Sequence, residues 1–178
     1  MTNLQQYLKT NKPSKVKRGS KTTAYIFEDK VLLRTIDPVK EAMVHGWFPD
    51  SEYLPEVLGT DLEDKDEAFS VYKSPRYLQG RSIKALVNKE DYETVYQPLR
   101  RMYAKADWSR DSYKWHDNFI ADVTNCEGLK EELKEVLIQA YEACMAFSHK
   151  VRFEISPRNV AATKEGQLIV LDCFFIIS

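Results

Sequence analysis

Apolar and polar positions follow a strand-like pattern in the first part of the chain. Residues 22–27 combine β-branched and aromatic side chains, residues 31–34 are mostly apolar, and a polar turn at residues 28–30 separates the two runs. Such runs on either side of a polar turn are typical of a β-hairpin. Pro38 then begins a stretch that we expect to be helical through His45, because proline is tolerated in the first turn of a helix.

A second strand pair is predicted at residues 53–58 and 68–72, where apolar and β-branched residues again flank a polar segment. Five acidic residues lie within residues 61–67, and we expect them at a solvent-exposed hairpin tip. These patterns together predict an antiparallel sheet that extends from about residue 16 to about residue 73.

Helical periodicity dominates the second half of the chain. Residues 82–106 predict a helix in which Pro98 causes a kink or a new start. Residues 129–149 carry apolar side chains at three- and four-residue steps, with charged residues on the other face, which makes this the clearest predicted helix. Residues 107–127 show no pattern that assigns them to an element.

Composition narrows the class of protein. The chain has 178 residues with 26 basic and 27 acidic side chains, so its formal net charge is -1, which argues against bulk binding of nucleic acid. Cys126, Cys144 and Cys173 are too widely spaced for a disulfide framework or a zinc site. Because the sequence shows no signal peptide and no run of about 18 apolar residues, we expect a cytoplasmic protein that contacts no membrane.

Three polar residues near the C-terminal end have a spacing that suits phosphoryl transfer. Glu154 is followed five residues later by Asn159, and Asp172 comes 13 residues after Asn159. A tight hairpin with Gly166 in its turn is predicted between Asn159 and Asp172. A carboxylate and an amide oxygen can hold Mg²⁺ against nucleotide phosphates, while a second carboxylate can orient the attacking hydroxyl.

The segment from Glu154 to Asn159 resembles the catalytic loop of the protein-kinase-like superfamily, and residues 171–174 resemble its metal-binding D-F-G region. Within that superfamily, the chain is most similar to the early serine/threonine kinases of short-tailed lytic bacteriophages, which also place Phe before the catalytic acid. The resemblance implies a two-lobed α+β fold. It consists of an N-terminal arm or helix (1–14), an antiparallel N-lobe (15–74) and an abbreviated, mainly helical C-lobe (75–178).

The N-terminal half agrees with this resemblance in the order of its motifs. Residues 18–25 resemble a degenerate glycine-rich loop, residues 31–34 resemble the V-A-I-K strand, and residues 69–73 resemble the strand that leads to the hinge between lobes. The resemblance implies the following nucleotide-binding residues: Gly19, Ser20, Lys21, Arg34, Val71 and Tyr72.

The resemblance also implies the catalytic roles. Arg34 holds the phosphates, Glu41 on the following helix pairs with Arg34, and Glu154 orients the substrate hydroxyl. Asn159 and Asp172 hold Mg²⁺, and both residues are expected to converge with Arg34 and Glu41 in a cleft between the lobes. The implied cofactors are ATP and Mg²⁺, and the implied substrates or targets are proteins of the bacterial host, in its cytosol.

The sequence departs from the family pattern at several positions. Arg34 stands where the family has Lys, Glu154 stands where it has Asp, and the glycine-rich loop keeps one Gly of three. Six residues follow Asp172, so we expect neither an activation loop nor the helices that dock protein substrates.

Two interpretations from different classes therefore remain. In the first, the protein is an ATP-Mg²⁺-dependent serine/threonine kinase or autokinase that modifies host proteins. In the second, it is a catalytically weak pseudokinase that inhibits or redirects a host factor by binding it. For Glu154, Asn159 and Asp172 a purely structural role, as hydrogen-bonded ends of a hairpin, is the alternative to a catalytic one.

Two further interaction surfaces follow from the sequence. Residues 168–177 are almost uniformly apolar, so an uncovered strand edge there would allow a homodimer to form. Basic residues within 9–21 and 100–114, with aromatic residues within 103–115, offer a weaker third interpretation as a nucleic-acid surface. The balanced net charge argues against that third interpretation.

Overall fold

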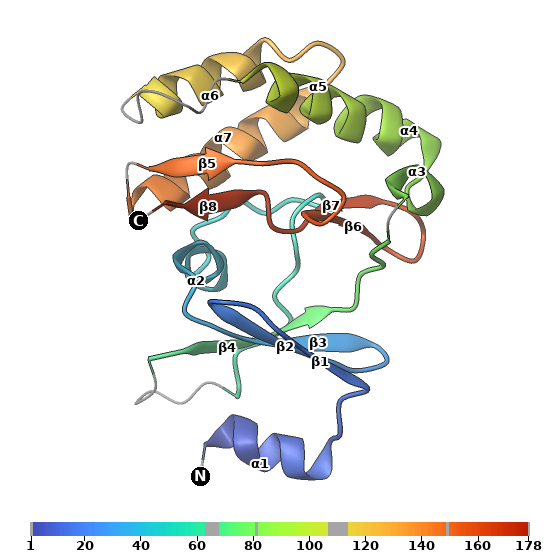
Figure 1. The fold of residues 1–178 in the computed structure, drawn as a ribbon, viewed down its shortest axis with the longest axis vertical. Helices are drawn as coiled ribbons and strands as arrows, with labels where there is room; N and C mark the ends of the chain where they lie inside the picture. Colours follow the sequence, from blue (N-terminus) through green and yellow to red (C-terminus); the bar gives the residue numbers. More distant parts are fainter. Residues whose placement is uncertain (1, 63–67, 81, 107–113, 149, 178) are drawn as a thin grey trace. The chain divides into compact units, whose positions relative to one another are not determined.

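The computed structural model of the chain describes residues 2–62, 68–80, 82–106, 114–148 and 150–177. It is a mixed α+β structure with an antiparallel sheet in its N-terminal part and a largely helical remainder, which confirms the predicted fold class (Figure 1). The chain divides into two compact units. Unit 1 consists of Met1–Gly46 and Pro55–Arg76, and unit 2 consists of Trp47–Leu54 and Tyr77–Ser178. Most of the predicted acidic tip lies outside the described residues.

The sheet of unit 1 contains four strands in the order β1-β2-β3-β4, and every neighbouring pair is antiparallel. The first three strands follow one another directly in the chain. The antiparallel β2–β3 pair confirms the hairpin predicted at residues 22–34. The strand bounds are β1 (Lys15–Arg18), β2 (Thr22–Ile26), β3 (Lys30–Thr35) and β4 (Ser70–Pro75).

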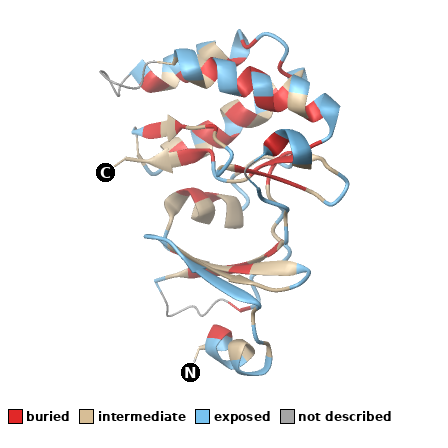
Figure 2. Ribbon diagram, turned by 45° about the vertical axis from the view of Figure 1, so that its right-hand side comes forward, coloured by how far each residue is buried: buried red, intermediate tan, exposed pale blue. Residues whose placement is uncertain are grey.

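Two short helices lie on opposite faces of this sheet, as Figures 1 and 2 show. Helix α1 (Asn3–Thr10) begins at a capping box in which the side chains and main-chain N–H groups of Thr2 and Gln5 bond reciprocally. Its Leu4 joins a buried cluster with Leu32, Leu62 and Val71 of unit 1. Helix α2 (Pro38–Val44) begins at Asp37, whose carboxylate accepts a hydrogen bond from the N–H of Val39, and it confirms the helix predicted after residue 37.

The strand predicted at residues 53–58 is wrong. Only the end of this region meets the sheet, where the N–H of Leu58 donates to Lys73 O at 2.8 Å and the N–H of Lys73 donates to Gly59 O at 2.9 Å. Pro55 lacks the N–H that a strand ladder requires, and Tyr53 and Leu54 are buried within unit 2. Of the apolar side chains that suggested a strand, Tyr53 and Leu54 thus enter the core of unit 2, whereas Leu58 is exposed.

The helical region at residues 82–106 is divided more than the sequence suggested. It contains α3 (Ile83–Leu86), α4 (Lys89–Asp91), the π-helical segment η1 (Tyr92–Tyr96) and α5 (Gln97–Lys105). The change of geometry precedes Pro98, which lies in the first turn of α5, as predicted. Because Pro98 has no N–H to donate to Thr94 O, that carbonyl accepts a hydrogen bond from the N–H of Lys130 at 3.2 Å.

Two further helices complete the helical part of unit 2. Helix α6 (Trp115–Thr124) lies in the region that showed no pattern in the sequence, and α7 (Glu131–Met145) is the predicted long helix, shorter at both ends. Phe119 of α6 stacks on Tyr141 of α7 at 4.3 Å between ring centroids. Phe174 packs against both of these rings and Phe153 packs against Phe119, so the helices rest on the strands that carry the candidate site. None of the described helices combines the length and apolar character that crossing a membrane requires.

Unit 2 also contains two short antiparallel pairs. β5 (Val151–Phe153) pairs with β8 (Phe174–Ile176), and β6 (Val160–Ala162) pairs with β7 (Leu168–Val170). The predicted hairpin with Gly166 in its turn is confirmed, and Gly166 has φ 89°. A β-carbon at that position would also lie 3.3 Å from the main-chain nitrogen of Asn88, so both conformation and space favour glycine. The apolar segment 168–177 is thus two strands, each paired within unit 2.

Candidate active site

The main-chain oxygen of Asn159 joins two loops of unit 2. It accepts hydrogen bonds from the N–H of Leu171 at 2.9 Å and the N–H of Asp172 at 3.1 Å, and the Cys173 thiol donates to it at 3.3 Å. The loop between β5 and β6 is therefore fixed to the loop between β7 and β8. This junction brings together the two segments that the sequence identified.

The side chain of Asn159 is held in one orientation. Its amide Nδ2 donates to the main-chain oxygen of Glu154 at 3.2 Å, and its Oδ1 accepts from the Ser156 hydroxyl at 3.0 Å. These two partners identify which end of the amide is the oxygen. Because a carbonyl oxygen has two lone pairs, Oδ1 keeps one for a cation while the other is used by Ser156.

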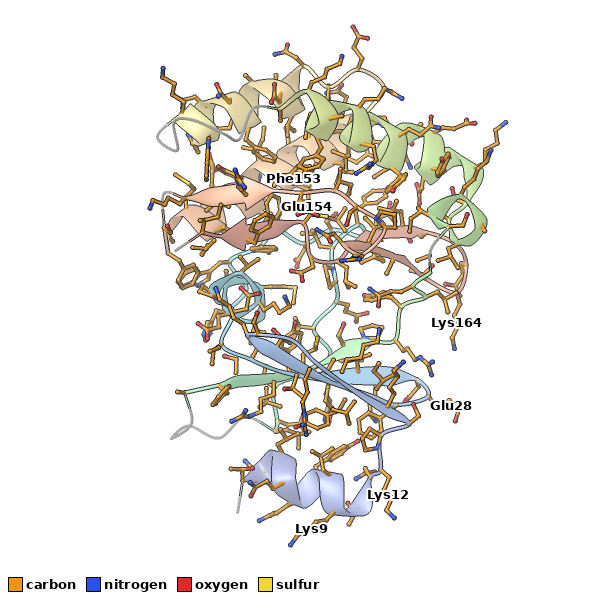
Figure 3. The ribbon with its side chains drawn as sticks, viewed as in Figure 1. Lys9, Lys12, Glu28, Phe153, Glu154 and Lys164 are labelled. Atoms are coloured by element: carbon orange, nitrogen blue, oxygen red, sulfur yellow. The ribbon has the colours of Figure 1, made fainter. Side chains whose placement is uncertain are left out.

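Glu154 belongs to the same junction. Its main-chain N–H donates to Cys173 O at 2.8 Å, directly beyond the β5–β8 pair. Phe153, its neighbour in Figure 3, is buried against the aromatic core, whereas the Glu154 side chain is half-buried. Within the described part of the chain, no hydrogen bond or salt bridge engages the Glu154 carboxylate, so the carboxylate can accept a proton or a hydrogen bond.

Cys173 is a packing residue of this junction and not a nucleophile. Its side chain is 2% exposed, and burial raises the pKa of the thiol well above the usual value. The neighbouring carboxylate of Asp172 raises the pKa further, while a main-chain hydrogen bond partly opposes both effects. The sulfur is therefore a neutral thiol that donates to Asn159 O and contributes no thiolate.

Arg100 supports the loop that carries Glu154. The guanidinium Nη1 of Arg100, on α5, donates to the main-chain oxygen of Ile155, the residue that follows Glu154. The Ile155 side chain is fully buried, which fixes the same peptide from its other side. The sequence placed Arg100 only in the nucleic-acid interpretation, because a contact across 55 residues leaves no local signal.

A buried polar network holds the β6–β7 hairpin. Asp91, 3% exposed, accepts hydrogen bonds from the N–H of Leu168 at 3.0 Å, from the Asn88 side chain at 3.1 Å and from the Lys130 ammonium at 3.1 Å. Lys130 also donates to the Tyr53 hydroxyl at 2.7 Å.

The charge state of Lys130 follows from these partners. Desolvation alone would lower the pKa of Lys130, but hydrogen bonds to Tyr53, Glu90 and Asp91 outweigh it and raise the pKa. Lys130 therefore stays charged and neutralises the buried Asp91 carboxylate. The hairpin that leads to Asp172 is thus anchored by an ion pair that the sequence pattern did not reveal.

The predicted phosphate loop is a tight exposed turn in unit 1. Gly19, Ser20 and Lys21 connect β1 to β2, and the N–H of Gly19 donates to Thr22 O at 2.8 Å. Lys21 O accepts a hydrogen bond from the N–H of Ile36 at 3.0 Å, which ties the turn to the end of β3. Whether these residues contact a nucleotide stays a prediction.

The structure places Arg34 on the face of the sheet that α1 covers. Arg34 pairs with Val71 across β3 and β4, and Val71 belongs to the buried cluster that contains Leu4 of α1. The Arg34 guanidinium lies 3.3 Å from the ring centroid of Phe69. Glu41 belongs to α2, on the opposite face of the sheet, so the strand register gives the predicted Arg34–Glu41 ion pair no support.

Val71 and Tyr72, the other predicted nucleotide-binding residues, are both buried in β4. They point to opposite faces because side chains alternate along a strand. The predicted convergence of Asn159 and Asp172 with Arg34 and Glu41 joins residues of both units, and it stays a prediction.

The donor set in unit 2 fits a magnesium ion that is bound together with a nucleotide. Asn159 Oδ1 and the exposed Asp172 carboxylate are hard oxygen donors on the two loops that the Asn159 main chain joins. Among the described residues, no group of three or more His, Cys, Asp or Glu side chains could hold a metal ion. Such a group is not required here, because Mg²⁺ usually takes one or two carboxylates together with phosphates and water.

Comparison with known proteins finds resemblance in structure only. No protein-family model matches the sequence, and no curated protein matches it. A choline kinase from Streptococcus pneumoniae has 12% sequence identity and a TM-score of 0.41, with 95% of this chain and 66% of that chain covered.

A thermostable mutant of an aminoglycoside phosphotransferase, solved as a ternary complex with AMP-PNP and hygromycin B, has 19% identity and a TM-score of 0.38, with 97% of this chain and 71% of that chain covered. The chain thus spans about two thirds of the length of these neighbours.

Proposed function

We propose that this chain is an ATP-dependent phosphotransferase of the protein-kinase-like type. One observation carries the proposal: a single hydrogen-bonded junction in unit 2 holds Glu154, Asn159 and Asp172 together. A proton acceptor and two oxygen ligands on adjoining loops are the parts that phosphoryl transfer requires.

Each residue of the junction has a distinct task in this proposal. Asn159 Oδ1 and the Asp172 carboxylate would hold Mg²⁺, which neutralises charge on the nucleotide phosphates. Glu154 orients the acceptor hydroxyl and takes its proton. The acceptor oxygen forms a bond to the γ-phosphorus, the bond from that phosphorus to the bridging oxygen breaks, and ADP leaves with the electron pair.

The phosphate-side residues belong to unit 1 in the same proposal. The exposed turn Gly19, Ser20 and Lys21 offers main-chain N–H groups and an ammonium to phosphate oxygens. Glu41 and Arg34 would act with it in a nucleotide complex, and Val71 and Tyr72 would border the nucleotide.

We further propose that the acceptor is a serine or threonine hydroxyl of a protein, either a bacterial host protein or the chain itself. The order of the motifs along the sequence supports this choice, through their resemblance to the early kinases of lytic phages. The structural neighbours, by contrast, are named for small acceptors, choline and an aminoglycoside. Both acceptor classes therefore belong in the test.

The test measures transfer of labelled γ-phosphate from ATP. Acceptors are the chain itself, a bacterial extract, choline and hygromycin B, each with and without Mg²⁺. The wild-type chain is compared with Glu154→Gln and Asp172→Asn, and with Glu165→Gln as a control that removes an exposed carboxylate from the hairpin turn. Transfer that needs Mg²⁺, survives Glu165→Gln and is reduced by the other two substitutions supports the proposal. Equal incorporation by all four proteins contradicts it.

The alternative of a pseudokinase that acts on a host factor by binding it is favoured by one observation. Arg34, the basic residue of the V-A-I-K-like strand, emerges on the α1 face of the sheet and stacks on Phe69. A guanidinium that stacks on an aromatic ring in this way has a structural role within unit 1, which is the role this alternative requires of it. Host inhibition that persists in both Glu154→Gln and Asp172→Asn would select this alternative.

A further inference from the structure

The two edges of the unit 1 sheet differ in whether their outward main-chain groups are paired. At the β4 edge, Leu58 and Gly59 pair with both main-chain groups of Lys73, at 2.8 and 2.9 Å. The other edge is β1, which forms the end of the strand order and pairs with β2 alone among the described strands. All four residues of β1 are exposed, whereas β4 is mostly buried.

The register shows which groups of β1 face outward. The N–H of Phe27 donates to Lys30 O at 2.9 Å, so residues 23, 25 and 27 of this hairpin direct their main-chain groups to β3. Ile26 and Thr22 therefore direct theirs to β1, and the bonds from Ser14 to Ile26 and from Gly19 to Thr22 confirm this. By the same alternation, the N–H and C=O groups of Val16 and Arg18 point to the outer side.

Positive charge surrounds these open groups. Lys15 and Lys17 project from one face of β1 and Arg18 from the other, while Lys12 and Lys21 lie just before and after the strand. No acidic residue occurs before Glu28. Among the described residues, none of these five cations takes part in a salt bridge, and their partners on β2 are uncharged.

We propose that the outer edge of β1 is a docking site for an acidic, extended peptide segment of another protein, which adds to the sheet as an outer strand. Main-chain hydrogen bonds to Val16 and Arg18 would give affinity, and side chains opposite β1 would give specificity. In an antiparallel pairing, acids lie opposite Arg18, Lys17 and Lys15, and an apolar residue lies opposite Val16, which is 42% exposed.

Charge decides between this partner and the alternatives. A second copy would bring the same three cations against themselves, and like charges directly opposite each other destabilise a strand pair. A nucleic acid would match the charge but cannot use the alternating N–H and C=O groups of Val16 and Arg18. Residues 12–21 also contain no aromatic side chain on which a base could stack.

The experiment measures fluorescence anisotropy of a labelled peptide, Gly-Thr-Glu-Glu-Val-Glu-Thr-Gly, added to the full chain without nucleotide. A second peptide replaces its Val with Pro, which keeps the charge and removes one strand N–H. A labelled oligothymidine tests nucleic acid, and sedimentation of the chain alone tests self-association. Because no nucleotide is present, the outcome is independent of the proposed phosphotransferase activity.

Two variants test the protein side. Val16→Pro removes the outward N–H that would donate to the carbonyl of the peptide Val and leaves every charge in place, so it should weaken binding of the Val peptide. Lys15→Glu with Lys17→Glu should weaken binding of the acidic peptide about tenfold or more. The matched control, Lys9→Glu with Lys164→Glu, reverses two exposed cations that are not part of β1 and should leave binding unchanged.

Saturable binding of the Val peptide, weaker binding of the Pro peptide and loss of affinity in the β1 charge reversal support the proposal. Equal binding of both peptides would overturn strand addition even if Val16→Pro does not fold, because the peptides test the reciprocal bond, from the peptide N–H to Val16 O. Tighter binding of oligothymidine, dimerisation through β1 or no peptide binding would overturn it as well.

Discussion

The main-chain oxygen of Asn159 accepts a hydrogen bond from the main-chain N–H of Asp172, at 3.1 Å. The two proposed metal ligands are thus joined through backbone atoms, and neither side chain is used for the connection. A substitution that changes only the Asp172 side chain leaves the junction in place. Ligand chemistry and local folding can therefore be tested separately.

Asp172→Asn should weaken Mg²⁺-dependent ATP binding about 10- to 100-fold, a range seen even for residues that only support a metal ligand. The exposed position of Asp172 predicts almost no change in the free energy of unfolding. Calorimetric titration of ATP with and without Mg²⁺ measures the first effect, and thermal unfolding measures the second. Equal ATP affinity in both proteins at saturating Mg²⁺ would exclude Asp172 as a ligand.

Glu154→Gln should lower phosphoryl transfer by about 10²–10⁴-fold, the usual contribution of a positioned proton acceptor. ATP affinity should stay nearly constant, because the main-chain bonds of Glu154 to Cys173 and Asn159 do not involve its carboxylate. Single-turnover transfer of labelled phosphate separates the chemical step from binding. An unchanged rate would show that another group, or water, takes the proton.

Arg100→Ala should reduce kcat about 10- to 100-fold while KM for ATP stays within a small factor, because the Glu154 loop loses the bond at Ile155 O. Arg101→Ala, an exposed neighbour on α5, is the matched control. Arg100→Lys should restore part of the rate, since an ammonium can donate to the same carbonyl. A parallel loss in both alanine variants would point to general damage of α5.

Lys130→Ala should lower the free energy of unfolding by about 3–5 kcal/mol, because it leaves the Asp91 carboxylate, 4% exposed, without its cation. Lys134→Ala is the control: Lys134 pairs with Glu131, whose side chain is 84% exposed, and such pairs contribute about 0–1 kcal/mol. Urea unfolding of both variants measures the difference. Similar losses would mean that the buried pair contributes no more than an exposed one.

Stability should fall at alkaline pH because of Cys173. Its pKa is raised in the folded chain, so above about pH 8.5 the unfolded chain releases a proton that the folded chain retains. The folded state is therefore favoured below that pH and loses up to about 1.4 kcal/mol per pH unit above it from this one group. Unfolding curves between pH 7.5 and 9.5, wild type beside Cys173→Ala, check this: the variant should show a shallower decline, and identical slopes would contradict it.

The sequence predicted those parts of the fold that depend on local pattern. Neighbouring residues alone determine these parts, through alternation, helical periodicity or a glycine in a turn. They are the β2–β3 hairpin, α2, α7 and the turn at Gly166. The strand expected at residues 53–58 failed because apolar content does not show which core a side chain enters, and Tyr53 is buried in unit 2. Periodicity cannot settle such a choice.

In the candidate site, too, a local pattern marks some residues, whereas others act from distant parts of the sequence. Glu154, Asn159 and Asp172 were predicted from their spacing and from the resemblance that this spacing carries, because all three lie on one hairpin and its flanks. Arg100 and Lys130 act on that hairpin from helices that are distant in sequence, so no local pattern identifies them. Arg34 matched a motif by position, but only the strand register revealed which face of the sheet it occupies.

The division of the chain into units also affects the order in which they can be completed during synthesis. The chain passes from one unit to the other after Gly46, after Leu54 and after Arg76. A nascent chain that ends at Arg76 contains every strand of unit 1 but leaves Tyr53 without Lys130 and Val170, its hydrogen-bond partners. No single division of the chain separates the two units, because each unit is built from two separate segments. A fragment that ends at Arg76 contains all of unit 1 together with residues 47–54 of unit 2, and a fragment that begins after Arg76 lacks those residues.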